Sequence, residues 1–206
     1  LKVTHYNDGS EIPNNYNDWQ NNNGGAYLNY NPEYGNIYNG FTFTDDRGIC
    51  PDGWHVPSDE DFIKLEMFLG MSEDETLKLN VYRGTNQGSK LANYPEFWQN
   101  GILISDAEFG TSGFDAPPSG YIQSDGVDNF LNTNTKSAFW TSSTSGASGQ
   151  NYMRLLSWDE TGIYRHTSNL NWGFSIRCLE TVLGCTNPNA TNYDETANVD
   201  DGSCEY

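Results

Sequence analysis

The sequence predicts an α+β domain followed by a short, disulfide-closed module. A capped helix signal near residue 58 precedes four strand-like segments after residue 137, and the turns between them are rich in Gly and Asn. The composition then changes at Gly184, because residues 184–206 carry five acidic side chains and no Lys or Arg. We therefore expect two domains, residues 1–181 and 182–206.

The clearest helix is expected to begin after Ser58. Ser58 is a good N-cap, and the acidic residues that follow it favour the positive end of the helix dipole. The inward-facing stripe predicted for this helix consists of Phe62, Leu65, Phe68 and Leu69. Gly70 is a suitable residue to end it.

A second, shorter helix is expected after Ser72, ending near Asn80. Residues 72–75 have the pattern of a capping box, in which side chain and backbone bond each other at the helix start. Residues 84–135 are loop-like, with paired prolines at 117–118. A loop region of this length indicates a functional surface or many small strands.

Strands are expected in two parts of the chain. The early ones are residues 26–30 and 40–44, and the late ones are residues 138–144, 152–158, 162–167 and 173–180. Residues 159–162 form the predicted hairpin turn between two late strands. In the last strand, Phe174, Ile176 and Cys178 share one face because side chains alternate along a strand.

The charge of the chain excludes several classes of partner. Asp and Glu number 28 against 10 Lys and Arg, a formal net charge of −18, which repels nucleic acid and anionic membranes. No apolar run reaches the roughly 18 residues that membrane insertion requires. The opening residues have no signal-peptide pattern, so we expect a mature or excised piece of a longer chain. An acidic, Asn-rich, Lys-poor composition suits a secreted, calcium-rich setting.

Four cysteines allow three disulfide pairings. The spacing favours Cys185 with Cys204, which closes a polar loop and would stabilise it by ~3 kcal/mol, and Cys50 with Cys178. The alternative is four free thiols in a cytosolic protein. No C-x-x-C pattern is present, which disfavours a zinc ribbon or a thioredoxin-type motif.

Five segments of the chain, in order, resemble the Fibrobacter succinogenes major paralogous domain. They are residues 1–13, 49–58 (ICPDGWHVPS), 113–121 (GFDAPPSGY), 139–144 (FWTSST) and 173–178 (GFSIRC). The resemblance implies a C-type-lectin-like fold with two helices and small, loop-rich antiparallel sheets. It also implies a secreted or cell-surface bacterial protein and a Cys50–Cys178 bond. The segments 38–43 (YNGFTF) and 118–121 (PSGY) depart from the family pattern, which affects local loops only.

Residues 184–204 (GCTNPNATNYDETANVDDGSC) resemble a spacer repeat of bacterial surface proteins. The resemblance implies neighbouring domains in a longer parent chain. Oxygen-bearing side chains within this loop are typical Ca²⁺ ligands, so Ca²⁺ is the expected cofactor. The predicted metal ligands are Asn187, Asn192, Asp194, Asp200 and Asp201. The alternative is a solvated acidic turn in which these side chains cap the backbone.

The resemblance also implies a ligand-binding face on the late strands. Exposed Tyr and Trp rings stack on sugars or protein side chains, while Asn, Arg and His supply directional hydrogen bonds. The predicted ligand-binding residues are Tyr152, Arg154, Trp158, Tyr164, Arg165, His166, Asn169, Asn171 and Trp172. The alternative is that Trp158 and Trp172 pack in the core or against a hairpin.

No catalytic residues are expected. His5, His55 and His166 are isolated in the sequence, and none belongs to a metalloprotease pattern. The sequence also has no nucleophile elbow. The predicted function is an extracellular recognition or adhesion module that binds a glycan or a cell-surface protein, as part of a large secreted adhesin. The alternative is a structural module of a surface filament with no ligand of its own.

Overall fold

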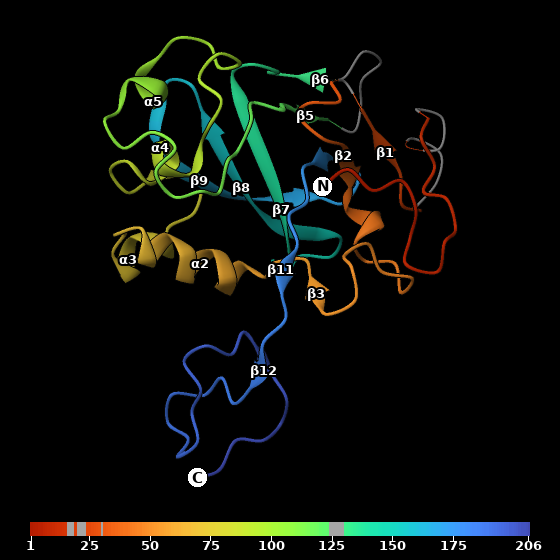
Figure 1. Ribbon diagram of the computed structural model, residues 1–206, viewed down its shortest axis with the longest axis vertical. Helices are drawn as coiled ribbons and strands as arrows, with labels where there is room; N and C mark the ends of the chain where they lie inside the picture. The colour runs from red at the N-terminus through yellow and green to blue at the C-terminus, as the bar shows by residue number, and fades with distance from the viewer. Residues whose placement is uncertain (16–18, 20–23, 30, 124–129) are drawn as a thin grey trace.

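Two antiparallel sheets and several short helices form the main body of the protein, confirming the α+β class (Figure 1). The structure is a computed structural model. It describes residues 1–206 with the exception of residues 16–18, 20–23, 30 and 124–129, and it leaves out the side chain of Phe130. The first sheet has the strand order β4-β9-β8-β7, formed by Tyr82–Arg83, Glu160–Asn169, Gln150–Ser157 and Lys136–Thr144. The second has the order β1-β2-β10-β5-β6, formed by Tyr27–Leu28, Ile37–Asn39, Gly173–Phe174, Tyr121–Ile122 and Phe130–Leu131.

Strands β7, β8 and β9 form a meander whose two faces differ in chemistry. These strands correspond to three of the four predicted late strands. The turn between β8 and β9 is tighter than the predicted turn at residues 159–162, since Ser157 already pairs with Glu160. Because side chains alternate, Met153 lies on one face and Arg154 on the other. Met153 pairs with His166 across the strands, and Arg154 pairs with Arg165.

Helix α2 (Asp59–Phe68) begins and ends as the sequence predicts. The Ser58 hydroxyl accepts a hydrogen bond from Asp61 N at 3.1 Å, and the Asp61 carboxylate accepts one from Ser58 N at 2.8 Å. Gly70 adopts a φ of +100°, in the region that favours glycine. The inward stripe is wrong at Phe68, whose side chain is 87% exposed. Six residues after Phe62, this position is rotated by about 120° around the helix from Phe62.

The other helices depart from the expectations. Helix α3 (Glu73–Thr76) is shorter than predicted, and the Ser72 side chain makes no capping hydrogen bond. Two further helices, α4 (Gln87–Leu91) and α5 (Ile102–Ser105), lie in the stretch predicted as loop.

The early strands match the prediction only in part. Strand β1 covers Tyr27–Leu28 of the predicted 26–30 segment, and Tyr30 lies outside the described residues. Residues 40–42 form a 3-10 helix, η1 (Gly40–Thr42), in place of the predicted strand. The cause is local, because the Asn39 side chain accepts hydrogen bonds from Thr42 N at 3.2 Å and from the Thr42 hydroxyl at 2.8 Å.

The last predicted strand divides into two short strands that belong to different sheets. Strand β10 pairs with β2 and β5, whereas β11 (Leu179–Glu180) pairs with β3 (Trp54–His55). Phe174 and Ile176 are buried, as their shared face predicts. Both belong to a core cluster with Trp140, Met153 and Leu155. A second core cluster, which includes Phe62 and Leu156, lies on the α2 side of the first sheet.

Both predicted disulfides are present. Cys50 and Cys178 have a Cα–Cα distance of 5.7 Å, and Cys185 and Cys204 have one of 4.9 Å. No cysteine within the described chain remains free.

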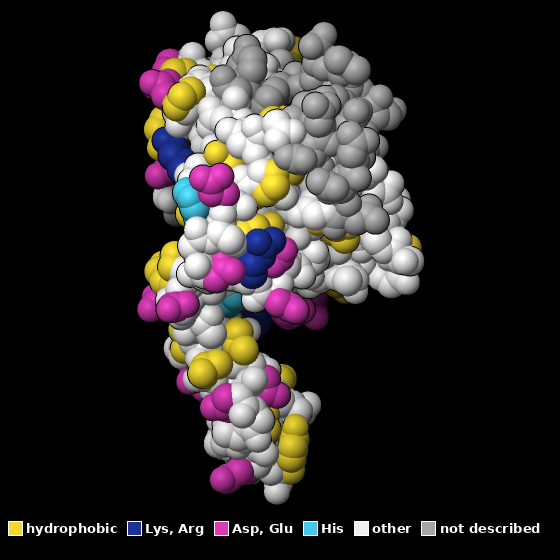
Figure 2. Space-filling model, turned by 90° about the vertical axis from the view of Figure 1, so that its right-hand side faces the viewer, with side chains coloured by type: hydrophobic (Ala, Val, Ile, Leu, Met, Phe, Trp, Pro, Cys, Tyr) yellow, Lys and Arg dark blue, Asp and Glu magenta, His cyan; other side chains and the backbone are white. Residues whose placement is uncertain are grey.

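Residues 182–206 extend away from the main body as a narrow projection that carries acidic side chains (Figures 1 and 2). A parallel pair, β12 (Leu183–Gly184) and β13 (Val199–Asp200), lies at its base. Hydrogen bonds near the junction run from Thr181 N to Gly53 O at 2.8 Å and from Asn198 Nδ2 to Glu180 O at 2.7 Å. Among the described helices, none has the length and apolar character of a bilayer span.

Candidate functional site

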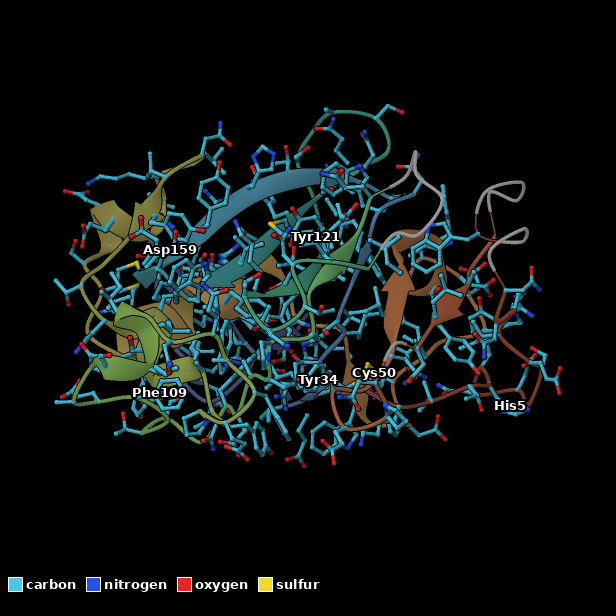
Figure 3. The ribbon with its side chains drawn as sticks, turned by 90° about the horizontal axis from the view of Figure 1, so that it is seen from above. His5, Tyr34, Cys50, Phe109, Tyr121 and Asp159 are labelled. Atoms are coloured by element: carbon cyan, nitrogen blue, oxygen red, sulfur yellow. A yellow bond between two sulfur atoms is a disulfide. The ribbon has the colours of Figure 1, made fainter. Side chains whose placement is uncertain are left out.

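One pocket of about 290 Å³ brings together three of the predicted ligand-binding residues. Tyr164 and His166 project from the same face of β9, and Trp172 lies in the turn before β10. Tyr121 on β5 also lines the pocket, on the side of the molecule away from Cys50 and His5 (Figure 3). The pocket therefore lies where the two antiparallel sheets meet.

The pocket has an apolar floor between two pairs of aromatic rings. Met153, Leu155 and Phe174 form the floor, and each is less than 9% exposed. On one side, Tyr82 and Tyr164 have ring centroids 5.1 Å apart. On the other, Tyr121 and Trp172 stack almost in parallel, at 6.1 Å and 11°. Paired rings of this kind hold each other in fixed orientations and offer flat apolar surfaces to a ligand.

Three polar side chains complete the pocket: Lys136, His166 and Ser168. The Nδ1 atom of His166 bonds to Asn80 Oδ1, so the ring proton is on Nδ1 and Nε2 is an acceptor. Asn80 is itself fixed, with a φ of 62° and its backbone N–H bonded to Arg165 O. Partial desolvation lowers the pKa of His166 from its usual 6.5, which favours the neutral ring at pH 7.

The hydroxyls of Tyr82 and Tyr121 are neutral near pH 7. Burial raises the pKa of Tyr82 to about 12 and also raises the pKa of Tyr121. The Tyr121 oxygen accepts a hydrogen bond from Asn132 Nδ2 at 3.0 Å. Its own O–H is therefore a donor available for a ligand.

Arg154 and Arg165, both predicted to face a ligand, lie on the opposite face of the sheet in a buried ion network. Arg154 is 1% exposed and bonds Asp59 Oδ1 at 2.7 Å and Glu66 Oε1 at 2.6 Å. Arg165 is 6% exposed and bonds Asp59. A ligand cannot reach these buried guanidinium groups, so we correct their assignment from ligand contact to the attachment of α2 to the sheet.

The network also contains Arg83, whose guanidinium bonds the Glu66 carboxylate at 2.8 and 2.9 Å. Burial opposes ionisation of Asp59, but hydrogen bonds from Arg165 and the charge of Arg154 outweigh it and lower the pKa of Asp59. Tyr152 packs on this side too, with Arg165 4.3 Å from its ring centroid. Tyr152 is therefore separated by the sheet from the pocket.

The remaining predicted ligand residues lie outside the pocket. Trp158 packs against the second core cluster and contacts Gly101, as the packing alternative predicts. Asn169 accepts a hydrogen bond from Gln150 Nε2 at 3.1 Å, and the backbone oxygen of Asn171 accepts one from Trp19 Nε1 at 2.9 Å. Both asparagines are exposed at the end of β9 and in the turn beyond it.

The predicted calcium ligands lie within turns of the projection, where their side-chain oxygens accept backbone hydrogen bonds. These bonds run to Asn187 from Asn189 N, to Asn192 from Glu205 N, to Asp194 from Thr196 N, to Asp200 from Gly202 N and to Asp201 from Ser203 N. This is the capping arrangement of the alternative interpretation. Within the described residues, no three His, Cys, Asp or Glu side chains group as a metal site.

His55 lies at the junction with the projection and is bonded on both ring nitrogens. Nδ1 lies 2.9 Å from the Thr181 hydroxyl, and Nε2 lies 3.4 Å from Asp61 Oδ2. The same Asp61 oxygen caps α2. A cavity of about 590 Å³ opens beside this group and includes the exposed Trp54.

Sequence reasoning missed several pocket residues: Tyr82, Tyr121, Lys136, Met153, Leu155 and Ser168. Tyr121 belongs to the GFDAPPSGY segment, but that segment gives no sign of its neighbours in space. The only signal for Met153 and Leu155 is their alternation with the residues of the other face.

Comparison with known proteins yields one match. A protein-family model described as the Fibrobacter succinogenes major domain (Fib_succ_major) matches residues 1–180. No curated protein and no solved structure shows significant similarity to the chain.

Proposed function

Since the chain belongs to the Fibrobacter succinogenes major domain family, we propose that it is an extracellular recognition module that binds a glycan or a surface protein. The observation that carries this proposal is the pocket between the two sheets, where Tyr82, Tyr121, Tyr164 and Trp172 surround an apolar floor. Concave sites lined by aromatic rings with a few polar groups are the usual form of small-ligand sites.

A C-type-lectin-like fold for residues 1–181 is part of the proposal. It rests on the resemblance of the five sequence segments, and the mixed α+β architecture supports it. The late strands β7–β9, on which the resemblance places a ligand-binding face, contribute Lys136, Tyr164 and His166 to the pocket.

An extracellular or cell-surface location is also part of the proposal. Two disulfides that leave no free cysteine in the described chain are typical of oxidising compartments. We propose that residues 182–206 act as a spacer that joins the binding domain to neighbouring domains of a large adhesin. Their attachment through a narrow base supports this role (Figure 2).

A glycan array probed with the full chain tests the proposal. Replacement of Trp172 by alanine removes one wall of the pocket and is expected to abolish binding. The matched control is Trp54→Ala, because Trp54 is 46% exposed and lies outside the pocket, so this variant is expected to bind normally. Near-UV circular dichroism verifies that both variants are folded.

Two outcomes would contradict the proposal. One is the absence of binding to every glycan and to bacterial or host cell surfaces, which favours a structural module of a surface filament. The other is equal loss of binding in the Trp172 and Trp54 variants, which would mean that the pocket is not the binding site.

A further inference from the structure

The pocket differs in charge from the rest of the chain. Acidic residues outnumber Lys and Arg by 28 to 10 in the sequence, yet no Asp or Glu is among the described side chains that line the pocket. Lys136 is the lining residue that supplies a positive charge, because the His166 ring is neutral at pH 7. The pocket therefore offers an anion a local environment that most of the surface does not.

Two polar groups of the pocket, the Lys136 ammonium and the Tyr121 hydroxyl, are available as hydrogen-bond donors. Lys136 has an ammonium group with three donors and no acceptor. The Tyr121 O–H is free to donate because its oxygen already accepts from Asn132. One acceptor is provided by His166 Nε2, since Nδ1 carries the ring proton and donates it in a hydrogen bond to Asn80 Oδ1. Two donors, one of them a cation, match a carboxylate, which only accepts hydrogen bonds.

The shape of the pocket limits the size of the ligand. Its volume of about 290 Å³ lies near the lower end of the ~300–1,000 Å³ typical of small-molecule sites. The ring pairs Tyr82–Tyr164 and Tyr121–Trp172 present flat apolar surfaces, against which the C–H face of a sugar ring packs. One ring fits such a space, and a longer chain would have to extend out of it.

From these features we propose that the pocket binds a single carboxylate-bearing sugar ring of the uronic acid class. The inference rests on the proposed function and names the ligand class for the same site. The ring packs on the aromatic walls, the carboxylate pairs with Lys136, and a ring hydroxyl donates to His166 Nε2.

The charge of the whole chain does not prevent such binding. At physiological ionic strength the Debye length is about 8 Å, so the distant acidic residues are largely screened. The acids that act on the pocket wall are Asp159 and Glu160, which influence Tyr82. A direct contact with the Lys136 ammonium is screened much less than these longer-range interactions.

The test compares two sugars that differ only at the sixth carbon, methyl β-glucuronide and methyl β-glucoside. Calorimetric titration of the full chain is expected to show the glucuronide binding at least ~10-fold more tightly, because hydrogen bonds to charged groups stabilise by roughly 1.5–3 kcal/mol. In the Lys136→Gln variant, the glucuronide affinity is expected to fall to that of the glucoside, whose own affinity is unchanged. Lys136→Arg is expected to restore the preference.

The matched control is Lys64→Gln, because Lys64 is an exposed lysine on α2, on the other side of the first sheet. It is expected to bind both sugars as the unmodified chain does.

Equal affinity of the unmodified chain for the two sugars would overturn the inference and leave the proposed function intact. A further outcome is that a glycan binds but neither sugar perturbs the Trp172 indole signal in nuclear magnetic resonance spectra. This would overturn the inference and show that the binding site lies outside the pocket. No binding of any glycan or surface protein would overturn both.

Discussion

Replacing Glu66 by glutamine is expected to destabilise the protein strongly. Glu66 is fully buried and accepts three hydrogen bonds, two from Arg83 and one from Arg154, at 2.6–2.9 Å. Glutamine preserves the shape and one oxygen acceptor but removes the charge. Arg83 would then lose its carboxylate partner, and Asp59 would be the one carboxylate left in a network of three guanidinium groups.

The expected loss follows from the count of charges in the network. Three arginines and two carboxylates give a net charge of +1, and the substitution raises it to +2 in a largely buried region. Removing one partner of a buried ion pair costs roughly 3–5 kcal/mol. We expect a loss in that range, a large part of the ~5–15 kcal/mol that stabilises a typical domain.

Urea denaturation followed by tryptophan fluorescence measures the change, since urea is uncharged and does not screen ion pairs. Glu60→Gln is the matched control, because Glu60 is exposed on the same helix and its loss should alter the unfolding free energy by less than about 0.5 kcal/mol. Arg154→Met is expected to cost less than Glu66→Gln. It leaves two balanced pairs, Arg165 with Asp59 and Arg83 with Glu66.

Two results would refute this reasoning. One is a loss below about 1 kcal/mol for Glu66→Gln, which is no larger than an ordinary substitution. The other is a larger loss for Arg154→Met than for Glu66→Gln, which would show that the count of charges does not govern the stability of the network.

Three further predictions concern other parts of the molecule. The lowered pKa of Asp59 means that its ionised form stabilises the fold above pH ~4, and that this contribution is lost as the pH falls below 3.8. The urea midpoint should therefore fall less between pH 5 and pH 3 in Asp59→Asn than in the unmodified chain; an equal fall would contradict this. The paired substitutions Cys185→Ser and Cys204→Ser should remove ~3 kcal/mol of loop stabilisation. Chymotrypsin should then cleave at Tyr193 faster, while the melting temperature of the main body is unchanged. An unaltered cleavage rate would contradict the stabilising role of this disulfide. If Ca²⁺ binds at the predicted site, 1 mM Ca²⁺ should slow the same cleavage, and Asp200→Asn should abolish this protection. Identical cleavage rates in Ca²⁺ and in chelator would refute the calcium site.

Features determined by neighbouring residues could be predicted from the sequence. The start of α2 at Ser58 and its end near Gly70 follow from hydrogen bonds and backbone angles within a few residues. Strands β7–β9 follow from alternation and turn residues. The 3-10 helix at residues 40–42 is also local, but the decisive Asn39 cap was outweighed by the aromatic residues, which favour a strand.

Features determined by distant residues could not be predicted in this way. Arg154 has its acidic partners 88 and 95 residues away, so nothing near it in the sequence marks it as buried. The pocket joins Tyr82, Tyr121 and Trp172 from three separate segments. Its rings meet only because of strand pairing, such as Tyr82 with Tyr164, and this register is set by the whole fold.

The two disulfides also determine how the chain would carry a mechanical load. A pull applied beyond Cys204 passes through the sulfur–sulfur bond to Cys185, and a pull that reaches Cys178 passes directly to Cys50. The segments that the two disulfides close, which span sequence separations of 128 and 19 residues, therefore carry none of the applied force. At ~3.4 Å per residue, the oxidised chain can lengthen roughly 500 Å less than the reduced chain. Strands β4–β10, which hold the aromatic pocket, all lie within the longer bypassed segment, so tension along the chain would leave the ligand site under no direct load.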